Sequence, residues 1–264
     1  MSAVLRGGQV AAALWLVTAL ASAQAVAGPL TTGEVSTPPR ADAMSGGQAV
    51  IRTRGASLLY TGLITPEAVA RARGLLEASP QVGEVVINSA GGDVEAGMDF
   101  GEAIHERGLD VRVVDGLCMS SCANYVFPAA RRKTIEPGSL VLWHGSMLQQ
   151  GLAGSIDFSR AEEQLGRPLT GFERWRGRRA VRSFVRAAGR RQAGFYDRIG
   201  VDATITVIGQ RQGCGCNWTL SIADMARFGV LDVSAPHDYA MPGYASTTIP
   251  WQLVRASGAN PVPD

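Results

Sequence analysis

Apolar and polar positions follow two different periods from residue 49 onward. Short apolar runs predict one or two strands with a glycine turn at 49–64, and a buried strand at 82–89. Each run is followed by apolar residues at helical spacing, at 65–77 and at 91–108. Because strands that alternate with helices are typical of parallel βαβ units, we expect an α/β fold.

The alternation continues in the next part of the chain. The pattern predicts a strand at 110–116, a short apolar helix at 120–130 and another strand at 139–145. The helix at 65–77 also has a start signal, with Thr65 as its cap and a proline in its first turn.

The pattern becomes helical and basic between residues 151 and 200. Eight arginines and no acidic residue lie from Arg174 to Arg191. This basic face can be ordinary solvated surface, or it can contact an acidic partner or an anionic membrane surface. Four of the arginines are spaced by four and share one helical face: Arg178, Arg182, Arg186 and Arg190.

The two ends of the chain differ from its middle. Residues 1–27 combine an arginine, an uncharged apolar stretch and small residues at cleavage spacing, which predicts a secretory signal peptide; an uncleaved inner-membrane anchor is the alternative. Residues 28–48 are expected to be a flexible linker. Residues 219–233 predict a capped helix and a short strand, and 234–264 a loose tail. We therefore expect an exported, periplasmic protein with one folded domain at 49–233.

Composition limits the classes of function. Of the 264 residues, 46% are hydrophobic and 18% charged, which suffices for a substantial core. The formal net charge of +2 is too small to indicate a nucleic-acid partner. In an oxidising compartment an even number of cysteines favours disulfides, with three pairings open, and a zinc site is the alternative. The cysteines are Cys118, Cys122, Cys214 and Cys216.

Three segments, in order, resemble the Clp protease proteolytic subunit and its ClpP/crotonase superfamily. "VVINSAGGDVEAGMDFGEAI" is similar to the strand-to-helix motif I-N-S-P-G-G-x-V-x-x-G. "GLCMSSCANYVFPAA" is similar to the G-x-x-x-S turn of the catalytic serine, and "IEPGSLVLWHG" to the P-x-S-x-x-x-x-H strand of the catalytic histidine. The resemblance covers roughly 62–161 and, more weakly, 217–233. It is closest to exported ClpP-like proteins with a C-x-S-x-C motif, and implies a repeated β-β-α spiral with a helical C-terminal insertion.

The resemblance implies a cofactor-independent serine hydrolase that acts on peptides or proteins. Counting from Gly116, the motif serine is Ser120 rather than Ser121, and the matched base is His144. A serine hydroxyl needs such a base and an oxyanion hole to act as a nucleophile. The implied oxyanion donors are the backbone N–H groups of Gly91 or Gly92 and of Ser121.

Two departures from the family pattern favour an alternative. Gly213 stands where the family has its acid, so Asp197 or Asp202 would have to supply the carboxylate. The only lysine, Lys133, lies beyond the serine helix, which disfavours a Ser-Lys dyad. The alternative is a non-catalytic ClpP-like module that binds a peptide or a partner chain.

The resemblance also bears on the cysteines and on assembly. It places the segment with Cys214 and Cys216 near the catalytic turn, and so implies at least one disulfide from that pair to Cys118 or Cys122. A local Cys118–Cys122 bridge is the alternative, since residues four apart on a helix can approach bonding range. Relatives usually form rings or trimers, so we expect a homo-oligomer.

Overall fold

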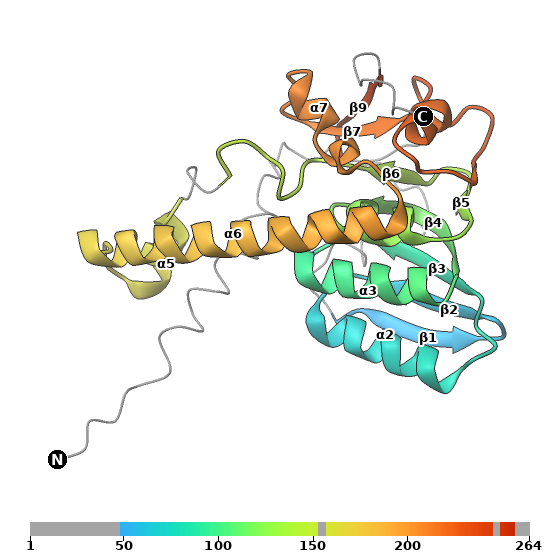
Figure 1. Ribbon diagram of the computed structural model, residues 1–264, viewed down its shortest axis with the longest axis horizontal. Coiled ribbons are helices and arrows are strands. Elements are labelled where there is room, and N and C mark those ends of the chain that lie inside the picture. The colour runs from blue at the N-terminus through green and yellow to red at the C-terminus, as the bar shows by residue number, and fades with distance from the viewer. Residues whose placement is uncertain (1–47, 153–156, 245–248, 257–264) are drawn as a thin grey trace, which may run out of the picture.

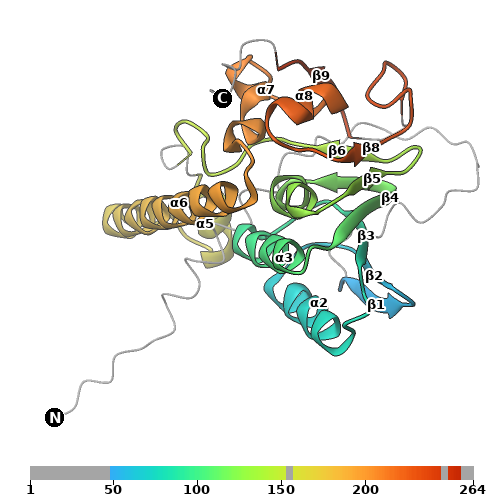
Figure 2. The ribbon, with the colours of Figure 1, turned by 45° about the vertical axis from the view of Figure 1, so that its right-hand side comes forward.

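A seven-stranded, mainly parallel sheet forms the centre of the molecule (Figure 1). The structure is a computed structural model that describes residues 48–152, 157–244 and 249–256. The predicted signal peptide and all but the last residue of the predicted linker lie outside these ranges. Helices α2 and α3 lie side by side along one face of the sheet (Figure 2).

The strand order is β1-β2-β3-β4-β5-β8, and β6 pairs with β4. Only β1 and β2 are antiparallel; the other pairs are parallel, which confirms the expected α/β class. The strands are β1 (Val50–Arg54), β2 (Ser57–Thr61), β3 (Glu84–Ser89), β4 (Asp110–Met119), β5 (Lys133–Ile135), β6 (Leu140–Leu142) and β8 (Val233–Ser234).

Strand β4 pairs with two strands on the same side because it bends in its middle. Its first half pairs with β5 and its second half with β6. Asp115 (φ +53°) and Gly116 (φ +153°) make the bend. Asn88 of β3 bridges it, since its amide donates to Asp115 O (3.1 Å) and its oxygen accepts from Leu117 N (3.2 Å). The end of β4 therefore runs beside β6.

The first two helices begin at side-chain caps. Thr65 Oγ1 accepts a hydrogen bond from Ala68 N (3.2 Å), with Pro66 in the first turn, as the sequence predicts. Asp93 Oδ1 accepts from Ala96 N (2.8 Å) at the next helix. The helices are α2 (Pro66–Ala78) and α3 (Val94–Glu106).

The short apolar helix predicted at 120–130 has an unusual geometry. It begins as a π-helical turn, η1 (Cys122–Val126), and continues as one α-helical turn, α4 (Phe127–Ala129). Every residue from 121 to 130 is buried, which explains why the segment is apolar apart from Ser121 and Asn124. π-Helical turns are rare and are often found at functional sites.

The basic segment forms α5 (Ser159–Leu165) and the long helix α6 (Gly171–Ile199), as predicted. Helix α6 begins at a capping box made by Thr170 and Glu173, and ends at Gly200 (φ +68°). Its 29 residues span about 43 Å at ~1.5 Å per residue. Of all helices in the described ranges, none is both long and apolar enough to cross a bilayer.

The C-terminal part folds against the sheet. Strand β7 (Asn217–Leu220) pairs in parallel with β9 (Trp251–Val254). The sequence predicts a loose tail from residue 234, but β9 is ordered and Tyr239, Tyr244 and Val254 are buried. Their apolar side chains join the main hydrophobic cluster. The short helices here are η2 (Ala203–Thr206), α7 (Ile208–Arg211) and α8 (Ile222–Arg227).

Candidate active site

Ser120 occupies a strained turn between β4 and η1. Its φ of +57° lies in the left-handed region, which a residue other than glycine seldom adopts. The backbone holds this turn at both sides: Ser120 N donates to Leu142 O (3.2 Å) and Ser120 O accepts from Asn124 N (2.8 Å). A serine on a sharp strand-to-helix turn is the geometry that presents a hydroxyl to a substrate.

The structure distinguishes the two neighbouring serines. Ser120 is half-buried, so its hydroxyl can be reached from solvent. Ser121 is only 1% exposed, and its Oγ has no hydrogen-bond partner in the described part of the chain. Its Cβ packs against Gly97 of α3, where a Cβ would approach it to 2.8 Å. Burial therefore withdraws the Ser121 hydroxyl from a substrate and leaves Ser120 as the candidate nucleophile.

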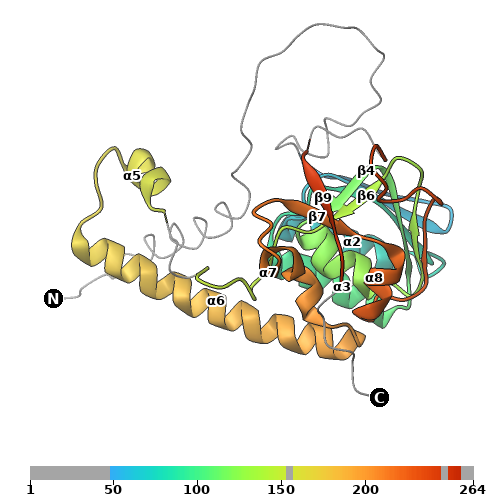
Figure 3. The same ribbon diagram turned by 90° about the horizontal axis from the view of Figure 1, so that it is seen from above.

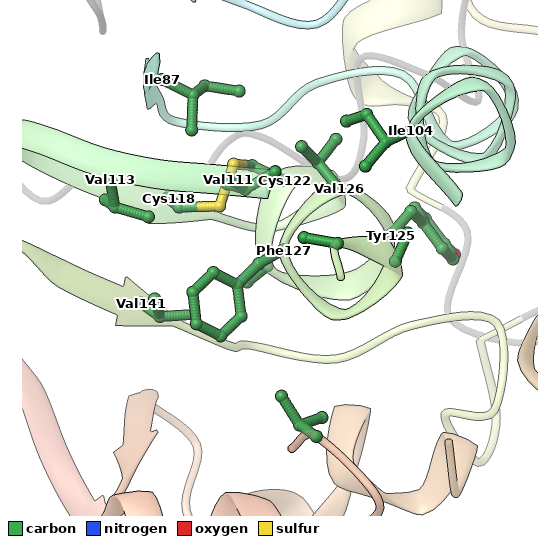
Figure 4. Packing of buried hydrophobic residues seen from close by; sticks show 14 of the residues in the cluster. Ile87, Ile104, Val111, Val113, Cys118, Cys122, Tyr125, Val126, Phe127 and Val141 are labelled. Carbon is green, nitrogen blue, oxygen red and sulfur yellow. A yellow bond between two sulfur atoms is a disulfide. The ribbon is translucent and has the colours of Figure 1, made fainter. Parts of the chain in front are cut away.

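A disulfide between Cys118 and Cys122 encloses Ser120 in a ring of five residues. The Cα atoms of the two cysteines are 5.2 Å apart and both side chains are fully buried. Figure 4 shows the bridge joining the end of β4 to the helix, among the aliphatic and aromatic side chains of the core. The bridge therefore fixes the backbone on either side of the strained serine.

The second disulfide joins Cys214 to Cys216 (Cα–Cα 5.1 Å). The predicted cross-link between the two pairs is therefore wrong, and the local alternative, Cys118–Cys122, is confirmed. The physical reason is that each tight turn already brings its own two Cα atoms within bonding range. The pairing consumes the thiols that a zinc site would use, and it indicates an oxidising, exported environment.

Gly91 and Gly92 pack against the serine turn in different ways. A Cβ on Gly91 (φ +85°) would lie 2.5 Å from Ser120 Cβ and 2.8 Å from Ser121 N, so only glycine permits this contact. Gly91 N–H donates to Ser89 Oγ (3.1 Å) and is not available to a ligand. The N–H groups of Gly92 and Ser121 have no acceptor among the described residues. Ser121 N lies against Gly91, and Gly92 follows Gly91 in the chain, so these two groups are the candidate oxyanion donors.

His144 follows β6 and is half-buried beside the serine turn. Met119 at the end of β4 pairs with Leu142 at the end of β6. Ser120 follows Met119 directly, and His144 is two residues after Leu142, so both lie close to this pair. Burial lowers the pKa of His144 below its ordinary value, which favours the neutral imidazole. No hydrogen bond joins the imidazole to the Ser120 hydroxyl in the part of the chain that the structure describes.

Neither predicted acid is brought to His144. Asp197 is exposed on α6, and Asp202 uses its Oδ1 to cap η2 through Thr204 N (2.8 Å). In the described ranges no carboxylate is hydrogen-bonded to the imidazole. The backbone of His144 is held instead by Gln210, whose Nε2 donates to His144 O (3.1 Å).

A buried polar network holds the loop that follows His144. Gln192 of α6 donates to Ser146 Oγ (3.2 Å) and accepts from the Tyr125 hydroxyl (2.8 Å). Asn124 of η1 donates to Gly145 O (2.9 Å). The network thus ties the histidine loop to the helix that follows the serine. The sequence signal for it is Gln192 itself, a polar residue at a position of α6 that the helical period assigns to the buried face.

The site therefore combines an accessible serine with left-handed backbone, a half-buried histidine whose pKa burial lowers, and two backbone N–H groups that have no acceptor among the described residues. These are the groups that acyl transfer to a serine requires. No protein-family model matches the chain, and no curated protein is significantly similar to it.

Proposed function

We propose that this chain is an exported serine hydrolase that cleaves peptide bonds. The observation that supports this most directly is the left-handed backbone of Ser120, held by a disulfide and packed against Gly91. A strained backbone persists only where the surrounding structure enforces it, and such residues cluster at active sites. The resemblance to the ClpP/crotonase superfamily, including its β-β-α spiral, belongs to this proposal and is consistent with the parallel strands and intervening helices.

The reaction follows from the positions of these groups. Ser120 Oγ attacks the carbonyl carbon of the peptide while the neutral His144 imidazole accepts the hydroxyl proton. The N–H groups of Gly92 and Ser121 donate to the oxyanion of the tetrahedral intermediate. The imidazolium then protonates the leaving amine, and water, activated by the same imidazole, hydrolyses the acyl-enzyme. The hydroxyl and the imidazole come within hydrogen-bond range when substrate binds.

The experiment is labelling with a fluorophosphonate, which bonds covalently to an activated serine. We expect the wild type to label and peptide mapping to locate the adduct on Ser120. Ser120→Ala should abolish labelling, and His144→Gln should slow it by about 100-fold or more. Ser121→Ala is the matched control and should retain labelling, because the Ser121 hydroxyl is buried. Loss of labelling in Ser121→Ala but not in Ser120→Ala would overturn the assignment.

A non-catalytic peptide-binding module is the second candidate. It is favoured by one observation: in the described ranges His144 has no carboxylate partner and no bond to Ser120. If the folded wild type fails to label but binds unstructured peptides, and Gly91→Ala removes that binding, this second function is the correct one.

A further inference from the structure

The amino-terminal half of α6 projects beyond the folded body together with α5. Figure 3 shows both helices extending away from the sheet. We call α5 and residues 171–186 of α6 the arm. Within 171–186 only Val181 is buried, whereas the rest of α6 contributes Ala188, Gln192, Phe195 and Tyr196 to the interior. The arm thus places most of its surface in solvent.

The two helices of the arm pack against each other. Phe158 packs its ring on Gly177, where a Cβ would approach the ring carbon to 2.7 Å. Arg174 is paired with Glu162 of α5 (2.6 Å). These contacts join α5 to α6 and fix which side of α6 faces outward.

The outward side of the arm combines aromatic and cationic side chains. Phe172 and Trp175 are 64% and 51% exposed, and their rings stack at 5.8 Å between centroids. Arg176 lies over Phe172 (5.8 Å), and Arg179 over Trp175 (5.7 Å). At about 3.6 residues per turn, these aromatic and arginine side chains lie on the side of α6 opposite Val181, and further arginines follow on the same side. On the arm, this outward face consists of Phe172, Trp175, Arg176, Arg179 and Arg186.

The outward face has no counter-charge of its own. Two of the three acidic residues of the arm are engaged elsewhere: Glu162 pairs with Arg174, and Glu173 with Arg167 (2.8 Å). The third, Glu163, lies on α5 rather than on α6. Arg191, which lies in α6 beyond the arm, forms ion pairs with Glu95 and Asp99 of α3. By contrast, no arginine of the outward face pairs with an acidic side chain among the described residues. The face therefore attracts an anionic partner.

The chemistry of the face selects the partner. A second copy joined through the same face would oppose two rows of arginines, which repel each other. An exposed Trp-Phe pair beside guanidinium groups is instead typical of helices that lie in the head-group region of a membrane. Guanidinium groups bind phosphate through two hydrogen bonds at once. We propose that the outward face of the arm binds an anionic phospholipid surface, with the arginines on the lipid phosphates and the two aromatic rings inserted between head groups.

The test is co-sedimentation of the full-length chain with lipid vesicles. We expect binding to vesicles that contain phosphatidylglycerol, weak binding to pure phosphatidylcholine, and a steep loss of the difference as salt is raised. Arg176→Gln combined with Arg179→Gln should weaken phosphatidylglycerol-dependent binding by about fivefold for each charge removed. Phe172→Ser combined with Trp175→Ser should weaken it at least tenfold.

Matched variants on the body serve as controls. Arg73→Gln removes an exposed arginine from α2, and Leu231→Ser removes an exposed apolar side chain; both should bind like the wild type. The proposal is overturned if phosphatidylglycerol does not increase binding, or if the body variants weaken binding as much as the arm variants. It is also overturned if the arm variants lose binding to an acidic protein or an oligonucleotide while the wild type ignores the vesicles.

Discussion

Gly91 packs directly against the turn that contains Ser120, so its substitution tests the candidate site. In Gly91→Ala the new Cβ would lie 2.5 Å from Ser120 Cβ, and its φ of +85° disfavours any L side chain. We expect a loss of about 2–4 kcal/mol in the free energy of unfolding, and labelling reduced by at least tenfold. Gly74→Ala is the matched control: it lies in helix α2 with no atom within 4 Å of the new Cβ, and should be neutral or stabilising. Equal behaviour of the two variants would contradict the proposed role of Gly91.

The pH dependence of labelling tests the histidine. His144 must be neutral to accept a proton, and burial lowers its pKa below the ordinary value of about 6.5. The neutral fraction therefore persists to lower pH than for a free imidazole. We expect the acidic limb of the labelling rate to have its midpoint below about pH 6.5, to vanish in His144→Gln, and to be unchanged in His237→Gln, whose ring is exposed. A midpoint above that of free imidazole would show that a different group titrates.

The residues of the site were predictable only in part. Counting from Gly116 in the G-x-x-x-S motif gives Ser120 as the candidate serine without the structure. The positive φ of Ser120 and the hydrogen bond that occupies Gly91 N–H could not be predicted, because backbone strain and hydrogen bonding depend on the packed neighbours. Sequence spacing likewise could not show that the Asp202 carboxylate caps η2 by accepting a hydrogen bond from Thr204 N.

Among the elements, β1, β2, β3, α2 and α3 follow from the hydrophobic period. The short strands β5, β7 and β9 do not, and neither does the geometry of the serine helix. The start of the serine helix is π-helical; it follows the Cys118–Cys122 bridge and lies in a segment, 121–130, in which every residue is buried. Strand β9 was missed because its four residues are too few for a period to be detected, and its partner β7 lies more than thirty residues earlier.

Removal of the Cys118–Cys122 bridge tests whether the disulfide holds the start of the serine helix in place. In Cys118→Ala combined with Cys122→Ala, loss of a five-residue ring should lower the free energy of unfolding by about 2 kcal/mol. The freed turn can relax toward negative φ at Ser120, so fluorophosphonate labelling should also slow. Denaturant unfolding and labelling kinetics measure the two effects. The pair Cys214→Ala and Cys216→Ala removes a bridge from a partly exposed loop and is expected to leave the labelling rate near that of the wild type. An unchanged rate in the Cys118/Cys122 variant would refute the role of the ring.

At the scale of the whole molecule, the site depends on two sheets that meet at the histidine strand. Trp143, the residue before His144, exchanges two backbone hydrogen bonds with Trp218 of β7, both 2.8 Å long. Strand β7 is in turn paired along its length with β9. The C-terminal segment thus stabilises a histidine more than one hundred residues earlier in the chain.

This arrangement predicts that damage to β9 reaches the candidate active site. Val254 is the buried residue of β9, at 6% exposure, and Val254→Asp would place a carboxylate in the hydrophobic cluster. We expect the free energy of unfolding to fall by more than ~2 kcal/mol, with labelling lost at temperatures where the main sheet is still folded, because β7 no longer holds Trp143. Gln252→Asp, on the exposed side of the same strand, is the matched control and should leave both unchanged. Circular dichroism and labelling followed over one temperature series would separate the outcomes: if labelling in Val254→Asp disappears only when the whole protein unfolds, the two sheets form one cooperative unit, and the C-terminal segment has no separate influence on His144.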